Sequence, residues 1–452
     1  MNIIVVGCGK VGVTVLQNLV AEGHDVTVID SDPAVLQEVT EISDVMGVCG
    51  NGADSQVLKE ASVEQAELFV AATGSDEFNM LSCFLARKLG VKHTIARIRN
   101  PEYNGAGLEF VKNNLELSGA INPDMLAAQE LYYILKLPSA MKIEHFAHRK
   151  FQIVELLLKE DSQLVGKPLS EIRSRYQDKF LVCAVQRGDE VFIPDGNSVL
   201  QGGDRIGLTA PTAELMPVMR SLGLAKKQVK DVMLLGGSRT AFYLAKRLLA
   251  AGNQVKIIDS DRTVCESLSE LLPKASVICG DGAQQELLLE EGLRNMDAFV
   301  ALTGMDEENI LVSCFANVQG VPKVIAKINR DEQGSLAEKL GLECIVSPRR
   351  IVADVVVRYA RAIENSLGSS VETLYKLMDG KAEALEFKVR EAPRIVGVPL
   401  KDLALKPRIL IAGIVREGVT VIPNGNDCIL SGDRVVVLAA DRRLNDLSDI
   451  LR

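Results

Sequence analysis

The chain has 452 residues, of which 47% are hydrophobic and 25% charged, and its formal net charge is −9. This length predicts about three or four domains, and the acidic balance argues against a nucleic-acid partner. No stretch approaches about 18 uninterrupted apolar residues and no basic segment follows Met1, so we expect neither a membrane-spanning helix nor a signal peptide, and we expect a cytoplasmic protein.

The first predicted elements are a strand, a glycine-rich turn and a helix. The apolar run from Ile3 to Val6 is typical of a buried parallel strand, and "GCGKVG" follows it with glycines in G-x-G-x-x-G spacing. Such glycines allow a tight turn, the approach of a pyrophosphate and close packing of the helix, whose N-terminus then meets the phosphate. The turn therefore predicts nucleotide contacts at Gly7, Cys8, Gly9, Lys10, Val11 and Gly12.

The next predicted strand, Val26 to Ile29, ends in a carboxylate. Asp30 lies 18 residues after Gly12, close to the roughly 20 residues expected for an acid that binds the ribose 2′-hydroxyl, and Ser31 follows it. Together the turn and the acid favour a nucleotide site over the alternative, a structural turn that binds nothing.

Two polar loops follow later strands of the same unit. In "CGNGAD", Asn51, Gly52 and Ala53 follow the third strand, where an adenine would lie. In "TGSDEFN", Thr73 and Gly74 follow the strand Leu68 to Ala72, beside the expected pyrophosphate. The alternatives are a plain glycine-rich loop and a plain helix cap.

Two charged residues complete the first predicted site. Glu77 opens the helix after the second loop, where an acid faces the helix dipole favourably. Arg97 lies on the fifth strand, between Thr94 and Ile98, and could meet a phosphate or form a surface salt bridge.

Short apolar runs alternate with helical patterns throughout this unit. This alternation indicates a doubly wound parallel sheet with right-handed crossovers, which binds ligands at the carboxyl ends of its strands.

The chain is a duplication with an offset of about 229 residues. "VVGCGKVGVTVLQNLVAEGHDVTVIDSD" falls on "LLGGSRTAFYLAKRLLAAGNQVKIIDSD", and the two later loops repeat as "CGDGAQ" and "TGMDEEN". Only the first of the three loop glycines is kept in the second unit, as Gly236; Ser238 and Ala241 stand in the places of the other two. The second loop could therefore bind a different nucleotide or bind one more weakly. Candidate contacts in the second unit are Gly236, Gly237, Ser238, Arg239, Thr240, Asp259, Asp281, Thr303, Gly304 and Lys327.

A smaller module follows each nucleotide unit. "LVGKPLSEI" pairs with "IVGVPLKDL", and apolar runs alternate with Pro-Asp-Gly or Pro-Asn-Gly turns, which predicts a small β-rich domain with one helix. The expected fold is α/β, with two Rossmann-like doubly wound domains at 1–138 and 229–366. Each is followed by a small α+β domain, at 139–223 and 367–452.

Catalytic groups do not stand out in the sequence. No conspicuous pair of nucleophile and base, no acid pair and no H-E-x-x-H or C-x-x-C motif accompanies the nucleotide loops, and the small modules are too short for the usual dehydrogenase substrate domain. We therefore expect a sensor with no enzyme activity and no metal site. The alternatives are an NAD-dependent oxidoreductase and a nucleotide sensor for some other partner.

With "GCGKVG", "DSD", "GNGAD" and "TGSDEFN" followed by "G-x-P-L" and "GD-R", the chain resembles the RCK (KTN plus TrkA-C) regulators of potassium channels and transporters. The tandem order is similar to that of the cytosolic subunit of bacterial Trk potassium uptake systems. The resemblance implies NAD(H) at the first unit and ATP/ADP or NAD at the second. It also implies a homo-oligomer, expected to be a tetramer, which attaches to the inner face of the cell membrane through a TrkH-like potassium channel and gates it.

Overall fold

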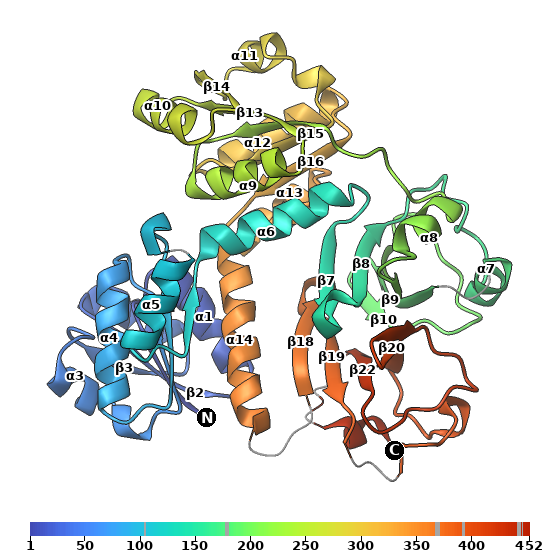
Figure 1. The fold of residues 1–452 in the computed structure, drawn as a ribbon, viewed down its shortest axis with the longest axis horizontal. Coiled ribbons are helices and arrows are strands. Elements are labelled where there is room, and N and C mark those ends of the chain that lie inside the picture. The colour runs from blue at the N-terminus through green and yellow to red at the C-terminus, as the bar shows by residue number, and fades with distance from the viewer. Residues whose placement is uncertain (104, 177–179, 367–370, 391–393, 441–443, 445) are drawn as a thin grey trace.

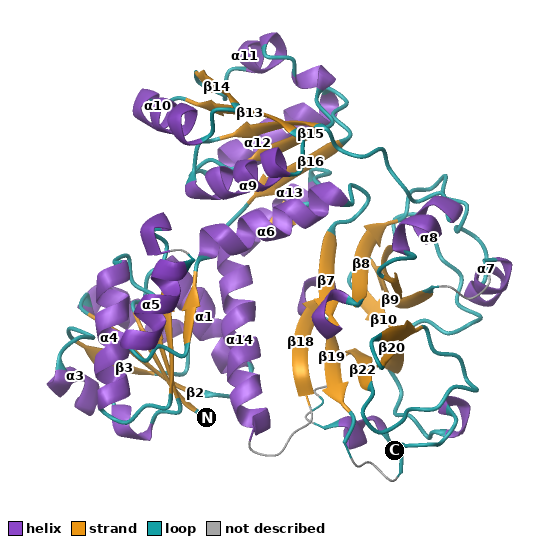
Figure 2. Cartoon of the chain, viewed as in Figure 1, coloured by secondary structure: helices purple, strands orange, loops and turns teal. Residues whose placement is uncertain are grey.

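The described residues of the protein form four sheets. The structure is a computed structural model, and it describes residues 1–452 except 104, 177–179, 367–370, 391–393, 441–443 and 445. Among these residues, two sheets have six strands and two have five. Figures 1 and 2 show how the sheets and the helices that cover them are arranged. Among the described residues, no helix combines the length and the apolar character needed to cross a membrane.

The first large unit is the doubly wound parallel sheet predicted from the sequence. Its strand order is β3-β2-β1-β4-β5-β6, and its central strands carry the apolar runs: all four residues of β4 are buried. The elements are β1 (Asn2–Val6), α1 (Lys10–Ala21), β2 (Asp25–Asp30), α2 (Pro33–Ile42), β3 (Met46–Cys49), α3 (Ser55–Glu60), β4 (Leu68–Ala71), α4 (Asp76–Lys88), β5 (His93–Arg97), α5 (Ala106–Asn114), β6 (Gly119–Ile121) and α6 (Pro123–Lys136).

The second large unit repeats this order as β14-β13-β12-β15-β16-β17. Both sheets therefore bring the ends of their first, second and fourth strands to one edge, as the duplication predicts. The elements are β12 (Asp231–Leu235), α9 (Arg239–Ala250), β13 (Gln254–Asp259), α10 (Arg262–Leu271), β14 (Ser276–Cys279), α11 (Gln285–Glu290), β15 (Ala298–Ala301), α12 (Asp306–Val318), β16 (Lys323–Lys327), α13 (Asp331–Lys339), β17 (Ile345–Val346) and α14 (Pro348–Ser366).

Each small domain is an antiparallel sheet, with strand orders β10-β9-β11-β8-β7 and β18-β19-β22-β20-β21. One helix was predicted for each. The described residues of the first domain form two helices, whereas in the described part of the second the corresponding segments are single 3₁₀ turns. The elements are β7 (Lys142–Phe146), β8 (Phe151–Leu157), α7 (Leu169–Arg175), β9 (Leu181–Arg187), β10 (Glu190–Phe192), β11 (Arg205–Pro211), α8 (Leu215–Ser221), β18 (Val371–Leu377), β19 (Ala382–Lys388), β20 (Ile409–Arg416), β21 (Val419–Val421) and β22 (Arg434–Ala440).

The last helix of each large unit packs on the other unit. Helix α6 lies along α9, and its apolar face joins the core of the second sheet through Ala127, Leu131 and Ile134. Helix α14 lies along α1 and buries Val356 and Ala360 against the core of the first sheet. Figure 1 shows α6 reaching toward α9 and α14 standing beside α1. This exchange joins the two large units into one body.

Candidate functional site

The first glycine-rich turn leaves open space where a phosphate is expected. Gly7 has a φ of +94°, and a Cβ there would lie 2.8 Å from the Thr73 side chain. A Cβ at Gly12 would lie 1.8 Å from the carbonyl oxygen of Gly7, so only glycine lets α1 approach the turn this closely. At Gly9, the N-cap of α1, a Cβ would meet no atom of the described residues within 4 Å apart from its chain neighbours. Lys10 is exposed and Val11 is half-buried beside this space.

Asp30 supports the turn from the end of β2. One carboxylate oxygen accepts a hydrogen bond from the Cys8 amide at 2.6 Å, and the other accepts one from the Asp32 amide at 2.9 Å. Burial and the neighbouring Asp30 charge raise the pKa of the Cys8 thiol to about 12, so this thiol stays neutral at physiological pH. Asp30 therefore shapes the phosphate turn in addition to any ribose contact, and Ser31 beside it is exposed.

The loop after β3 rests on the end of β1. A Cβ at Gly52 would lie 2.4 Å from Val6, which explains glycine at this position without a ligand. The Asn51 side chain accepts a hydrogen bond from the Ala53 amide at 2.9 Å. Asn51 is exposed and Ala53 half-buried, at the same edge of the sheet as the glycine turn.

The loop after β4 is fixed by a buried amide that the sequence analysis did not single out as a site residue. Asn79 is fully buried; its oxygen accepts from both the amide and the hydroxyl of Thr73, and its nitrogen donates to the carbonyl of Arg97 at 2.9 Å. Arg97 in turn donates to the Thr73 carbonyl at 2.7 Å. A Cβ at Gly74 would meet no described atom within 4 Å beyond its chain neighbours, so the space beside Thr73 is open.

Two acids open helix α4 and have different partners. Glu77 is exposed, and hydrogen bonds from its own backbone amide and from the Ser75 hydroxyl hold the pKa of its carboxyl below the ordinary value. Asp76 is buried and accepts hydrogen bonds from the amides of Arg99 and Asn100 at 2.8 and 2.7 Å. Asp76 thereby fixes the segment that follows Arg97.

The second turn keeps the same frame with different chemistry. Gly236 has a φ of +95°, and Asp259 accepts a hydrogen bond from the Gly237 amide at 2.5 Å, as Asp30 does from Cys8. The Ser238 hydroxyl caps α9 by accepting from the Ala241 amide at 3.4 Å. Arg239 is exposed at the start of α9, whereas Thr240 is buried.

The remaining residues of the second unit repeat the first arrangement. Asn309 accepts from the Thr303 amide at 3.0 Å and donates to the Lys327 carbonyl at 2.9 Å. Lys327 donates to the Leu302 carbonyl at 3.1 Å, and burial lowers its pKa. A Cβ at Gly304 would meet no described atom within 4 Å beyond its chain neighbours, and the exposed Asp281 accepts from the Ala283 amide at 3.0 Å.

These arrangements fit a phosphate-containing ligand. Open space lies over Gly9, Gly74 and Gly304, each beside backbone amides at a helix N-terminus or a strand end. The Nε of Arg97 is buried and has no hydrogen-bond partner within the described residues. The asparagines and Asp76 that hold the loops could have been found from the sequence, because "TGSDEFN" and "TGMDEEN" repeat them at equal spacing.

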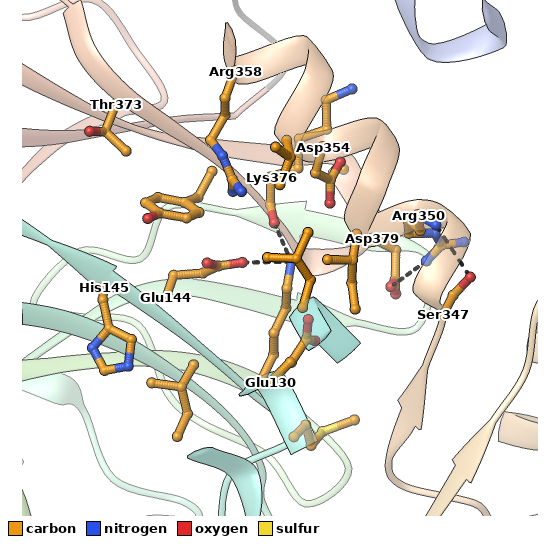
Figure 3. Close-up of a pocket in the computed structure, with 18 of the residues that line it drawn as sticks. Glu130, Glu144, His145, Ser347, Arg350, Asp354, Arg358, Thr373, Lys376 and Asp379 are labelled. Atoms are coloured by element: carbon orange, nitrogen blue, oxygen red, sulfur yellow. Dashed lines mark hydrogen bonds and ion pairs between the residues drawn. The ribbon is translucent and has the colours of Figure 1, made fainter. Parts of the chain in front are cut away.

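A cavity of about 1470 Å³ lies away from these loops, between the crossover helices and the small domains. Figure 3 shows Glu130 of α6, Glu144 of β7 and Arg358 of α14 pointing into it. Lys142 pairs with Glu144 at 2.9 Å and donates to the Lys376 carbonyl at 2.9 Å. Burial raises the pKa of Glu130 to about 7. This cavity could not be predicted from the sequence, because its lining residues come from many separate segments of both large units and both small domains.

Family models match the two large units and the two small domains separately. The family model of the TrkA-N domain matches residues 3–120 and 232–348, and that of the TrkA-C domain matches 153–223 and 384–452. A Trk system potassium uptake protein TrkA homolog from Archaeoglobus fulgidus is 32% identical over 453 residues and covers 100% of both chains. The Trk system potassium uptake protein TrkA of Haemophilus influenzae is 31% identical, covering 98% of this chain and 96% of its own.

A solved structure, the GsuK channel bound to NAD, shares the fold with a TM-score of 0.64 at 17% identity. The matched region includes 97% of this chain and 77% of the GsuK chain. The similarity thus extends over both large units and both small domains.

Proposed function

The chain belongs to the TrkA family of Trk system potassium uptake proteins, and we propose that it is a nucleotide-sensing regulatory subunit that gates a TrkH-like potassium channel. The observation that carries the proposal is the pair of glycine-led turns, each beside open space at the strand ends of a parallel sheet. Two such sites in one chain would let a regulatory protein respond to two nucleotides at once.

We assign NAD(H) to the first unit and ATP/ADP or NAD to the second. Gly9 and Gly74 leave room for a pyrophosphate, and the Asp30 carboxylate lies where a ribose would follow. In the second unit the Ser238 hydroxyl caps α9 where the first turn has Gly9, and the exposed Arg239 offers charge to a terminal phosphate. A solved structure of the same fold, the GsuK channel, is bound to NAD, which supports nucleotide binding but does not distinguish the two units.

We further propose that the chain assembles into a homotetramer. The tetramer reaches the inner face of the membrane through the potassium channel that it binds. Support comes from apolar side chains left exposed on equivalent helices: Leu81 on α4, and Leu311 and Val318 on α12, of which Val318 is 82% exposed. Large apolar side chains exposed at equivalent positions of the two units are candidates for burial between subunits. Domain limits of 1–138, 139–223, 229–366 and 367–452 belong to the same proposal.

Gating by ligands follows from linkage. A ligand shifts an equilibrium between two ring states only by its difference in affinity for them, and about 1 to 3 kcal/mol per site adds across equivalent sites. Several sites per ring would therefore steepen the response.

The test is nucleotide titration of the purified protein by calorimetry, alone and with its membrane partner in liposomes, while potassium flux is recorded. We expect saturable NADH and ADP or ATP binding and a flux that depends on the nucleotide. Incubation with NADH and carbonyl compounds is the control, because turnover would favour an oxidoreductase. Binding without any change in flux would point to a sensor for another partner.

A further inference from the structure

Asp124, in the first turn of α6, lies between the two nucleotide turns. One of its carboxylate oxygens accepts a hydrogen bond from the Thr240 hydroxyl at 3.1 Å, and the other accepts one from the Arg99 Nε at 2.9 Å. The Asp124 side chain is only 14% exposed. One carboxylate thus joins the first large unit to the first turn of α9 in the second.

Both partners of Asp124 lie close in sequence to proposed nucleotide contacts. Arg99 lies two residues after Arg97, and its backbone amide is fixed by Asp76 at 2.8 Å. Thr240 follows Ser238 and Arg239 in the phosphate turn of the second unit and is 2% exposed. A change at either loop would therefore reach the other through a single side chain.

The Asp124 charge also acts on the cations of both sites. Burial and the repulsion of Arg99 lower the pKa of Arg97, and Asp124 opposes this effect. Burial lowers the pKa of Lys327, and Asp124 again opposes it. The carboxylate therefore contributes to the electrostatic potential at both sites.

The link exists on one side of the pseudo-symmetric pair only. Helix α14 begins with "SPR" where α6 begins with "NPD", so Arg349 occupies the position equivalent to Asp124. Val11 occupies the position equivalent to Thr240 and has no hydroxyl. The first turn therefore cannot form the same bridge with α14.

We propose that Asp124 is a positioning residue that couples the two nucleotide sites, such that a nucleotide at one site weakens anion binding at the other. This inference rests on the proposed function and adds the regulation of its sites. A carboxylate beside the N-terminus of α9 opposes a phosphate there unless a cation neutralises it. Arg99 supplies that cation in this structure.

The sign of the coupling follows from the competition for Arg99. A phosphate at the first site attracts the arginines of the Arg97 to Arg99 segment, and Arg99 then neutralises Asp124 less. The unneutralised carboxylate repels a phosphate at the second site. Typical coupling between sites changes affinity by about 5- to 150-fold, and linkage makes the effect reciprocal.

The experiment measures NADH affinity by fluorescence titration of the full-length protein at increasing fixed concentrations of ADP. In the wild type we expect the NADH dissociation constant to rise at least about fivefold and then reach a plateau. Asp124→Asn should abolish the rise, and Asp124→Glu should retain part of it. Thr240→Val, which copies the residue of the first turn, should reduce it, whereas Asp161→Asn, at an exposed position of a small domain, should behave as the wild type.

The possible outcomes separate the inference from the function on which it rests. If both nucleotides bind but the rise is absent from the wild type, or equal in Asp124→Asn and the wild type, Asp124 does not couple the sites. A rise without a plateau that all variants share indicates competition for one site and also overturns the inference. If the folded wild type binds neither NADH nor ADP, the proposed function fails and the coupling with it.

Discussion

The Glu386 carboxylate of the second small domain accepts a hydrogen bond at 3.0 Å from the backbone amide of Ala147 in the first. The relation is mirrored, because Glu155 of the first small domain accepts one at 3.2 Å from the amide of Met378 in the second. Both amides lie in turns with left-handed backbone, at φ values of 47° and 50°. The two small domains thus fix each other's strained turns.

Glu386→Ala should lower the free energy of unfolding by about 3 kcal/mol or more, since it leaves the buried amide of Ala147 unpaired and removes a partner of Arg434 at 2.7 Å. Urea unfolding measures this change. The control is Glu171→Ala, at an exposed position of α7, which should change stability by less than about 0.5 kcal/mol. Equal effects of the two substitutions would contradict the prediction.

Gly12→Ala should destabilise the protein by about 1 to 3 kcal/mol, because its Cβ would lie 1.8 Å from the Gly7 carbonyl oxygen and α1 would have to move. Gly9→Ala is the matched control: its Cβ enters open space at a φ of −67°, which alanine adopts freely. Thermal unfolding should separate the two variants, and equal melting temperatures would show that α1 is not packed as described.

Asp30→Ala should weaken NADH binding at the first site by roughly ten- to a hundredfold. A lost hydrogen bond to a charged group costs about 1.5 to 3 kcal/mol, which corresponds to this change in affinity. The substitution removes a ribose acceptor and also frees the Cys8 amide that Asp30 holds at 2.6 Å. Calorimetry measures the affinity. Asp259→Ala, the equivalent change in the second unit, should leave NADH binding at the first site intact, and an unchanged NADH affinity in Asp30→Ala would refute the assignment.

The two turns should divide the nucleotides between them. Gly9→Val places a side chain in the open space over the first turn and should chiefly remove the NAD(H) response. Arg239→Ala should chiefly impair the ATP or ADP response, because it removes an exposed cation at the start of α9. Binding of each nucleotide to each folded variant tests this, and identical losses in both variants would show that the turns are interchangeable.

Glu130→Gln should change how stability depends on pH. Burial raises the pKa of this carboxyl from 4.5 to about 7, with Glu144 and Asp354 adding to the rise and Lys142 and Arg358 opposing it. The folded protein therefore holds the proton more tightly than the unfolded chain, so the wild type loses stability as the pH rises from about 4.5 to 7. Glutamine stays neutral and avoids this loss.

The advantage of the glutamine variant should thus be below about 1 kcal/mol near pH 5 and reach on the order of 3 kcal/mol near pH 8. Melting temperatures across this range measure it. Glu171→Gln on the exposed face of α7 is the control and should follow the wild type. A constant difference between Glu130→Gln and the wild type would contradict the prediction.

Local patterns in the sequence determined the strands, the turns and the duplication. The apolar runs of β1 and β4, the glycine spacing after Val6 and the acid at the end of β2 act over short distances, so their structure follows from neighbouring residues. The edge at which the loops gather also followed, because parallel strands with right-handed crossovers bring their carboxyl ends together.

Only the tertiary structure decided where α6 and α14 pack. The apolar face of α6, with Ala127, Leu131 and Ile134, shows that the helix needs a partner but does not identify it, because hydrophobic burial is not directional. In the folded chain α6 packs on α9 of the other half. This packing places Asp124 next to Thr240 and leaves the cavity that Glu130 lines. Contacts between segments more than a hundred residues apart leave no periodic pattern in the sequence, so the bridge and the cavity became visible only once the chain was folded.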